Sequence, residues 1–222
     1  MLVILTGLIA GFVHVISGPD HLAAISPISV ESKKSGWLIG FRWGLGHTGG
    51  VFIVAVIALL FRELIPMDII SSYSERLVGI ILIAIGAWGL QKIFSVKLHV
   101  HEHIHGGHKH FHFHHHFNRI PHQKKEAHFH THAALIVGIV HGLAGSSHLL
   151  GILPALALPA EIDAVIYLIA FGTGTIAAMM IFSESIGRIA RKFESIGELL
   201  YLRLSISFSS IAILIGIFWI VK

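Results

Sequence analysis

Five histidines and one aspartate stand inside apolar segments of this 222-residue chain, where ionisable side chains are rare. A charged group at the centre of a bilayer costs about 2.5–3.5 kcal/mol on insertion scales, so such groups are usually functional. Imidazole nitrogens with one carboxylate suit borderline divalent ions such as Ni²⁺, Co²⁺ and Zn²⁺. We therefore predict a metal site formed by His14, Asp20, His21, His47, His141 and His148.

The spacing of the first histidine pair requires a break in the helix. His14 and His21 are seven residues apart, which separates them by about 10 Å along an unbroken helix. Two ligands of one ion must lie closer, because metal–nitrogen bonds are about 2 Å long. A break at Gly18-Pro19 would fold Asp20 and His21 back toward His14. Histidines that only hydrogen-bond between packed helices are the alternative interpretation.

The second half of the chain repeats this stretch. Gly11–Pro27 aligns without a gap on Gly138–Pro154, with eight identities in 17 positions and an offset of 127 residues. The match includes both histidine pairs. Gly145 stands where Gly18 stands, which predicts a second interrupted helix. Interrupted spans at matching positions of two inverted halves are typical of secondary transporters.

The composition places the chain in a membrane. It is 54% hydrophobic and 13% charged, whereas about a quarter of a soluble domain is charged. We predict an all-α integral membrane protein with six transmembrane helices in two inverted three-helix repeats. The N-terminal segment lacks a signal-peptide pattern and is expected to be a retained span. The predicted spans are Leu2–Ser17, Trp37–Phe61, Leu77–Phe94, Ala133–Leu158, Ala164–Phe182 and Leu204–Val221.

The spans divide the chain into three parts. Residues 1–94 form the first three-helix repeat, 95–132 a histidine-rich loop, and 133–222 the second repeat. The segment from Leu98 to His132 holds 14 of the 19 histidines, which is typical of a low-complexity loop that binds metal. The candidate accessory ligands are His99, His101, His103, His105, His108, His110, His112, His114, His115 and His116.

The basic residues predict the orientation of the chain. Thirteen of the 16 lysines and arginines belong to the loops and flanks on one side, and three to the other. By the positive-inside rule, the histidine-rich loop is cytoplasmic and both termini lie outside a cell membrane. The net charge of +4 is thus explained by topology, and no nucleic-acid partner is expected. The absence of cysteine excludes thiolate ligands.

Two motifs resemble a known transporter family. HVISGPDHLAAI (His14–Ile25) resembles the His-x4-Asp-His signature of the nickel/cobalt transporters of the NicO group, and LGHTGGV (Leu45–Val51) is similar to their Leu-Gly-His-Ser/Thr motif. The resemblance implies that His14, Asp20, His21 and His47 recognise Ni²⁺ or Co²⁺. Here five residues separate His14 from Asp20, and six spans replace the eight of typical uptake members. The six-span layout with a histidine loop resembles the efflux branch.

We predict a secondary transporter of divalent transition-metal ions, Ni²⁺ and/or Co²⁺, whose two halves rock around the site. Uptake is slightly favoured over efflux, since a membrane potential of 100 mV drives a divalent cation inward by about 4.6 kcal/mol. The ion is the transported ligand, and no cofactor is expected. Candidate pathway groups are Thr173, Thr175 and Glu184.

Other interpretations stay open at this point. A Zn²⁺ transporter or a membrane metal sensor would use the same ligands. An intramembrane zinc-dependent hydrolase would activate a water on the metal, but the chain holds no His-Glu-x-x-His motif, and we do not expect an enzyme. Homo-oligomers and further transporter subunits are left undecided by the sequence.

Overall fold

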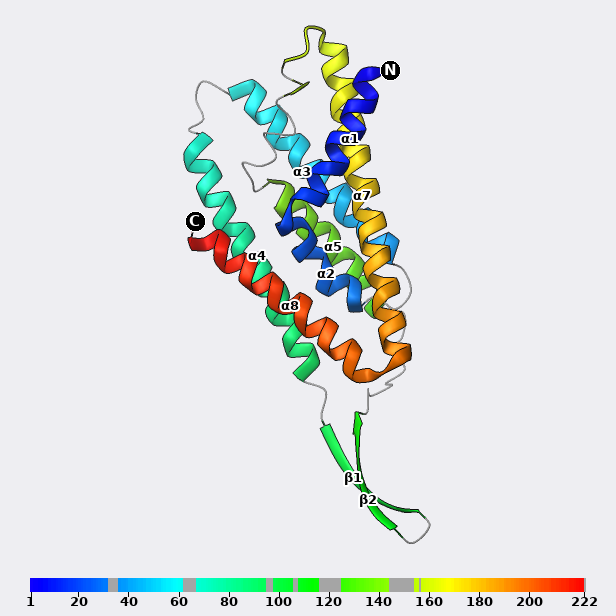
Figure 1. Cartoon of the computed structure of the whole chain (residues 1–222). Coiled ribbons are helices and arrows are strands. Elements are labelled where there is room, and N and C mark those ends of the chain that lie inside the picture. Colours follow the sequence, from blue (N-terminus) through cyan, green and yellow to red (C-terminus); the bar gives the residue numbers. More distant parts are fainter. Residues whose placement is uncertain are drawn as a thin grey trace.

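The structure is a computed structural model that describes residues 1–31, 36–61, 67–94, 98–105, 108–115, 125–143, 154–155 and 157–221. Its elements form a helical bundle with a β-hairpin at the end opposite the N-terminus (Figure 1). In chain order they are α1 (Leu2–Ser17), α2 (Pro19–Glu31), α3 (Gly36–Phe61), α4 (Met67–Phe94), β1 (Leu98–His105), β2 (His108–His115), α5 (Lys125–Leu143), α7 (Glu161–Ile196) and α8 (Glu198–Val221).

The helical membrane architecture predicted from the sequence is confirmed. Among the described residues, α7, α8 and the Glu75–Phe94 part of α4 are long and apolar enough to cross a membrane. The bent pair α1–α2 makes a fourth if it counts as one span. The other two predicted spans correspond to α3, which has 26 residues, and to α5, whose apolar part is Ala133–Leu143.

The predicted break in the first helix is also confirmed. Helix α1 ends at Ser17, Gly18 has extended backbone angles, and α2 begins at Pro19 with a bend of 72° between the two axes. Proline suits the first position of a helix because its missing N–H has no partner there in any case. A single Gly-Pro pair therefore turns one apolar segment into two short helices.

The histidine-rich segment differs from the predicted loop. Strands β1 and β2 pair antiparallel, and α5 begins at Lys125, eight residues before the predicted span. The sequence alternates histidine with Val100, Ile104, Phe111 and Phe113. This period of two, with β-branched and aromatic residues, is that of a strand. The low-complexity interpretation overlooked this alternation.

Helix α7 is longer than predicted, and α8 begins earlier. The spans were expected to end at Phe182 and to resume at Leu204, but the helices meet at Gly197. The sequence analysis predicts a loop for the charged stretch between them. Its apolar residues recur at helical spacing, and Ile186 and Ala190 pack with Val30 and Tyr201 in a buried cluster.

Glycines allow the helices to pack closely. Helix α1 lies along α7, α3 along α5, and α4 along α8. A Cβ on Gly11 would overlap the Phe171 carbonyl oxygen, and one on Gly138 would overlap that of Trp43. Helix α3 also crosses α7, where a Cβ on Gly36 would lie 2.7 Å from the Ser183 carbonyl oxygen. Such small-residue contacts are typical of membrane helices, where backbones must approach closely.

Candidate metal centre

The break between α1 and α2 gathers polar side chains inside the bundle. His14 comes from the last turn of α1, Asp20 and His21 from the first turn of α2, His47 from α3, and His141 from the last turn of α5. His47 and His141 are fully buried, His21 and Asp20 nearly so, and His14 is half-buried. Five of the six predicted ligands are thus brought together, and His148 lies outside the described residues.

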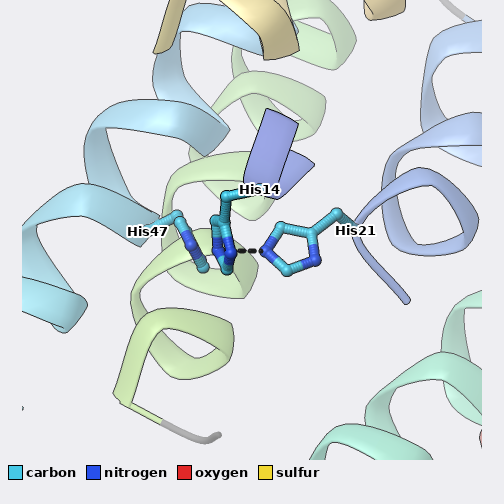
Figure 2. A group of neighbouring side chains, drawn as sticks. All are labelled: His14, His21 and His47. Atoms are coloured by element: carbon cyan, nitrogen blue, oxygen red, sulfur yellow. Dashed lines mark hydrogen bonds between the residues drawn. The ribbon is translucent and has the colours of Figure 1, made fainter. Parts of the chain in front are cut away.

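Three imidazole rings face one another at the centre of this group (Figure 2). The Nε2 atoms of His14 and His21 are 3.1 Å apart. One ligand nitrogen from each of His14, His21 and His47 can be chosen so that all three lie within 4.8 Å of one another. With metal–nitrogen bonds of about 2.0–2.1 Å, two nitrogens 3.1 Å apart subtend roughly 100° at an ion. That angle lies between the octahedral and tetrahedral values.

Asp20 ties two histidines together from outside this triangle. Its Oδ1 lies 3.0 Å from His21 Nδ1, and its Oδ2 lies 3.2 Å from His141 Nε2. An ionised carboxylate only accepts hydrogen bonds, so both imidazole nitrogens donate to it. The lone pair of His21 is then on Nε2, which faces His14. Carboxylates that orient metal-binding histidines in this way are common around protein metal ions.

Gly18 is required for the side chains to fold back on the break. A Cβ at this position would overlap His21 Nδ1 and would lie 3.0 Å from Asp20 Oδ1. The φ of Gly18 is −91°, which any residue adopts. The lack of room for a Cβ, and not the backbone conformation, therefore explains why glycine is needed at this position. Pro19 lies at the break as predicted, and Gly145 lies outside the described residues.

An aromatic wall surrounds the imidazoles, and the sequence interpretation missed it. Trp43 is fully buried and stacks on His47 with ring centroids 4.9 Å apart. Phe171 lies 5.4 Å from the ring of His14. Trp43 precedes His47 by four residues, and that spacing on a helix face was a signal available in the sequence.

Two cavities reach the cluster. One of about 500 Å³ is lined by Ala10, Val13, His14, Ser17, Gly18, Pro19, Asp20, His21, Pro154, Tyr167 and Trp219. A second, of about 20 Å³, touches His47 and Thr48 beside Phe171. The half-buried His14 thus borders the larger cavity, and His47 borders the smaller one. Each cavity leads to a different side of the imidazole triangle.

The three predicted pathway residues are not members of the ligand groups in the described part of the chain. Thr173 is exposed and donates to the Ile169 carbonyl, and the buried Thr175 donates to the Gly11 carbonyl over 3.4 Å. Glu184 accepts the Trp37 backbone N–H at the start of α3. It also pairs with two arginines of α7, Arg188 and Arg191. Thirteen residues separate Glu184 from Phe171, or about 20 Å along the helix.

The accessory histidines lie mainly on the hairpin. Strand pairing sets four pairs of them opposite one another, and His116 lies outside the described residues. The pairs are His99 with His114, His101 with His112, His103 with His110, and His105 with His108. His115 pairs with Leu98 in the same register.

The fold and the buried cluster define a helical membrane protein with a histidine–carboxylate centre. The chain is 35% identical over 192 residues to the urease accessory protein UreH of Bacillus sp. (strain TB-90), covering 84% of this chain and 77% of that protein. It belongs to the UreH family. No family model and no solved structure matches it.

Two plant proteins are similar to the chain as well. It is 34% identical over 183 residues to the chloroplast protein FOR GROWTH AND FERTILITY 1 of Arabidopsis thaliana, and 32% identical over 218 residues to FOR GROWTH AND FERTILITY 2. The matches cover 82% and 98% of this chain but 48% and 55% of those proteins, so the chain spans about half their length. None of these three relatives is named as an enzyme, which is consistent with the expectation that the chain is not one.

Proposed function

We propose that the chain is a secondary membrane transporter of divalent transition-metal ions, with Ni²⁺ and Co²⁺ as its cargo. The observation that carries the proposal is the buried triangle of His14, His21 and His47, whose ligand nitrogens lie within 4.8 Å of one another at a break in an apolar helix. Broken helices at bilayer depth are where secondary transporters bind their substrates.

The donor set favours a borderline ion. Three imidazole nitrogens bind the ion, and Asp20 orients His21 and His141 by accepting a hydrogen bond from each. His141 stands ready on the far side of Asp20, within a second group of close ligand atoms formed by Asp20, His21 and His141. His21 is common to the two groups, with its Nε2 facing His14 and its Nδ1 bonded to Asp20. His148 completes or relays the site in this proposal.

The choice of Ni²⁺ and Co²⁺ over Zn²⁺ rests on the motif resemblance and on the bacterial relative. UreH is named as a urease accessory protein, which relates this family to nickel. Import of Ni²⁺ into the cytoplasm fits that relation. Uptake is therefore the proposed direction, and a negative interior supports it by about 2.3 kcal/mol per charge at 100 mV.

Helix contacts support six spans in two inverted repeats. Gly11 packs against the Phe171 carbonyl, and its repeat mate Gly138 packs against that of Trp43. The rings follow the same pattern: His14 lies 5.4 Å from Phe171, and His141 lies 5.3 Å from Trp43. Offsets of 127 and 128 residues relate the members of these contacts. A pseudo-twofold axis between residues 1–94 and 133–222 accounts for this correspondence.

The outward orientation of both termini is part of the proposal. The basic residues of the described helices gather where α4 ends and where α7 meets α8, which is the hairpin end of the bundle (Figure 1). The larger cavity is lined instead by the first half of α7 and the end of α8, through Tyr167 and Trp219. Ions would enter this cavity from outside and meet His14 first. The cytoplasmic hairpin would then collect them.

Flux measurement in liposomes tests the proposal. Purified full-length protein should take up ⁶³Ni²⁺ under an inside-negative potential, and Co²⁺ should compete. Protein-free liposomes and the His14→Ala variant serve as controls for leak and for ions bound by the hairpin. Wild-type liposomes without flux of Ni²⁺, Co²⁺ or Zn²⁺ in either direction would overturn it. Imposed pH gradients in the same assay reveal a coupling ion.

A further inference from the structure

One indole contacts three of the four described site histidines. Trp43 stacks on His47 at 4.9 Å with an interplanar angle of 13°. Its ring centroid also lies 5.6 Å from that of His21 and 5.3 Å from that of His141. These histidines come from α3, α2 and α5, so the indole is a common surface for side chains of three helices.

Within the described part of the chain, no hydrogen bond holds this indole in place. Trp43 is 0% exposed, and its Nε1 has no hydrogen-bond partner among the described residues. Buried indoles usually find an acceptor for this N–H. Packing against neighbouring side chains therefore fixes the ring, and the imidazoles are part of that packing. The orientation of the indole and the orientations of the histidines depend on each other.

The position that corresponds to Trp43 in the sequence repeat carries a smaller ring. Phe171 takes the place of Trp43 in the second half and contacts only His14 among the described site histidines. Indole is the aromatic group that attracts cations best. A divalent ion bound here is balanced by one carboxylate, Asp20, among the described ligands. Part of the remaining positive charge falls on His47, the ring that stacks on the indole.

Resting on the transport function proposed above, we infer that Trp43 is a positioning residue of the ion site. Its ring holds the imidazoles of His21 and His47 at the angles that bind the ion, and it also contacts His141, which donates to Asp20. Its face also stabilises the charge that these rings acquire on binding. Groups that orient metal ligands typically contribute 10–100-fold to metal affinity.

Tryptophan emission measured during Ni²⁺ titration of the full-length protein tests this role. A paramagnetic ion bound beside Trp43 quenches its emission, whereas Trp37, at the start of α3 and 49% exposed, reports on the bundle end. Trp219 lines the larger cavity beside His14, so the titration uses a Trp88→Phe/Trp219→Phe background. That protein should show saturable quenching with or without Trp37→Phe, and adding Trp43→Phe should abolish it. The Co²⁺ absorption spectrum and ⁶³Ni²⁺ uptake are recorded on the same samples.

The substitutions separate positioning from core packing. Trp43→Leu should raise the KM for Ni²⁺ by about 10–100-fold and shift the Co²⁺ spectrum, and Trp43→Phe should recover part of the loss. Phe171→Leu should have the smaller effect. If the Trp43→Leu variant folds and keeps the wild-type KM for Ni²⁺ and the wild-type Co²⁺ spectrum, the inference is overturned. The transport proposal then remains intact. If the wild-type protein shows neither quenching of its tryptophan emission by Ni²⁺ nor ⁶³Ni²⁺ uptake, the transport proposal itself is overturned. If Trp43→Leu does not fold, Trp43→Phe with a wild-type KM and spectrum overturns the inference.

Discussion

The molecule holds histidines in two different settings. The segment from Leu98 to His132 carries 14 of them, many at alternate positions of a hairpin, whereas the helical bundle gathers four around one aspartate. In the bundle every ring has defined neighbours from other helices, and Asp20 orients two rings by hydrogen bonds. The hairpin repeats one residue type along two strands. Positions fixed by several elements, and not the number of histidines, define a selective site.

The largest expected effect comes from removing the shared histidine. His21 belongs to both groups of close ligand atoms, so His21→Ala should raise the KM for Ni²⁺ uptake more than 100-fold, beyond the roughly 10–100-fold typical of orienting groups. Uptake of ⁶³Ni²⁺ into liposomes measures this change. All hairpin histidines remain in this variant. Near-normal uptake would mean that the bundle cluster is not the transport site.

Loss of the orienting carboxylate should have the next largest effect. Asp20→Asn keeps the size of the side chain but replaces one acceptor oxygen with an NH₂ donor. Either His21 or His141 then loses its acceptor. We expect about a 10–100-fold rise in KM, measured by the same flux assay, with size-exclusion profiles as a check on folding. A variant with unchanged KM would show that Asp20 does not orient the ligands.

A single methyl group at the break should have a smaller effect. The backbone of Gly18 accepts alanine, but the new Cβ overlaps His21 Nδ1. We expect Gly18→Ala to weaken Ni²⁺ uptake about tenfold by displacing the ring. Gly197→Ala is the matched control, because a Cβ there meets nothing within 4 Å and the backbone is extended. Equal effects of the two substitutions would contradict the explanation by space.

The smallest effect is expected in the hairpin. Serine at His101, His103, His110 and His112 removes two cross-strand pairs. Tethered weak ligands raise the local ion concentration without taking part in transport, so the maximal rate should stay constant. Uptake at limiting Ni²⁺ should fall by no more than about threefold. A collapse of the maximal rate would place the hairpin in the transport path and reverse the comparison of the two regions.

Much of the site could be predicted from the sequence because intramembrane ionisable groups are so rare. The structure brings together five of the predicted ligands, His14, Asp20, His21, His47 and His141. The helix break lies at Gly18-Pro19, where the glycine and the proline predict it. Each of these predictions followed from a local rule about polarity or backbone geometry. The role of Asp20 between two histidines depends on which helices adjoin, and no local rule gives that.

Other features were hidden for identifiable reasons. Trp43 looks like an ordinary core residue until α2 and α5 are placed against α3. The charged end of α7 was mistaken for a loop because its apolar residues pack on α2 and α8 and not on lipid. The hairpin was missed because its histidines dominated the composition. In all three cases partners distant in the sequence decide the structure.

The glycine seams described above also limit how the bundle can move. Each of the three tight pairs, α1 with α7, α3 with α5 and α4 with α8, joins one helix from residues 1–94 to one from residues 125–221. The two halves therefore interlock, and a rocking movement of one half against the other would have to separate all three pairs. The close approach of α3 to α7 at Gly36 adds a further contact between the two halves.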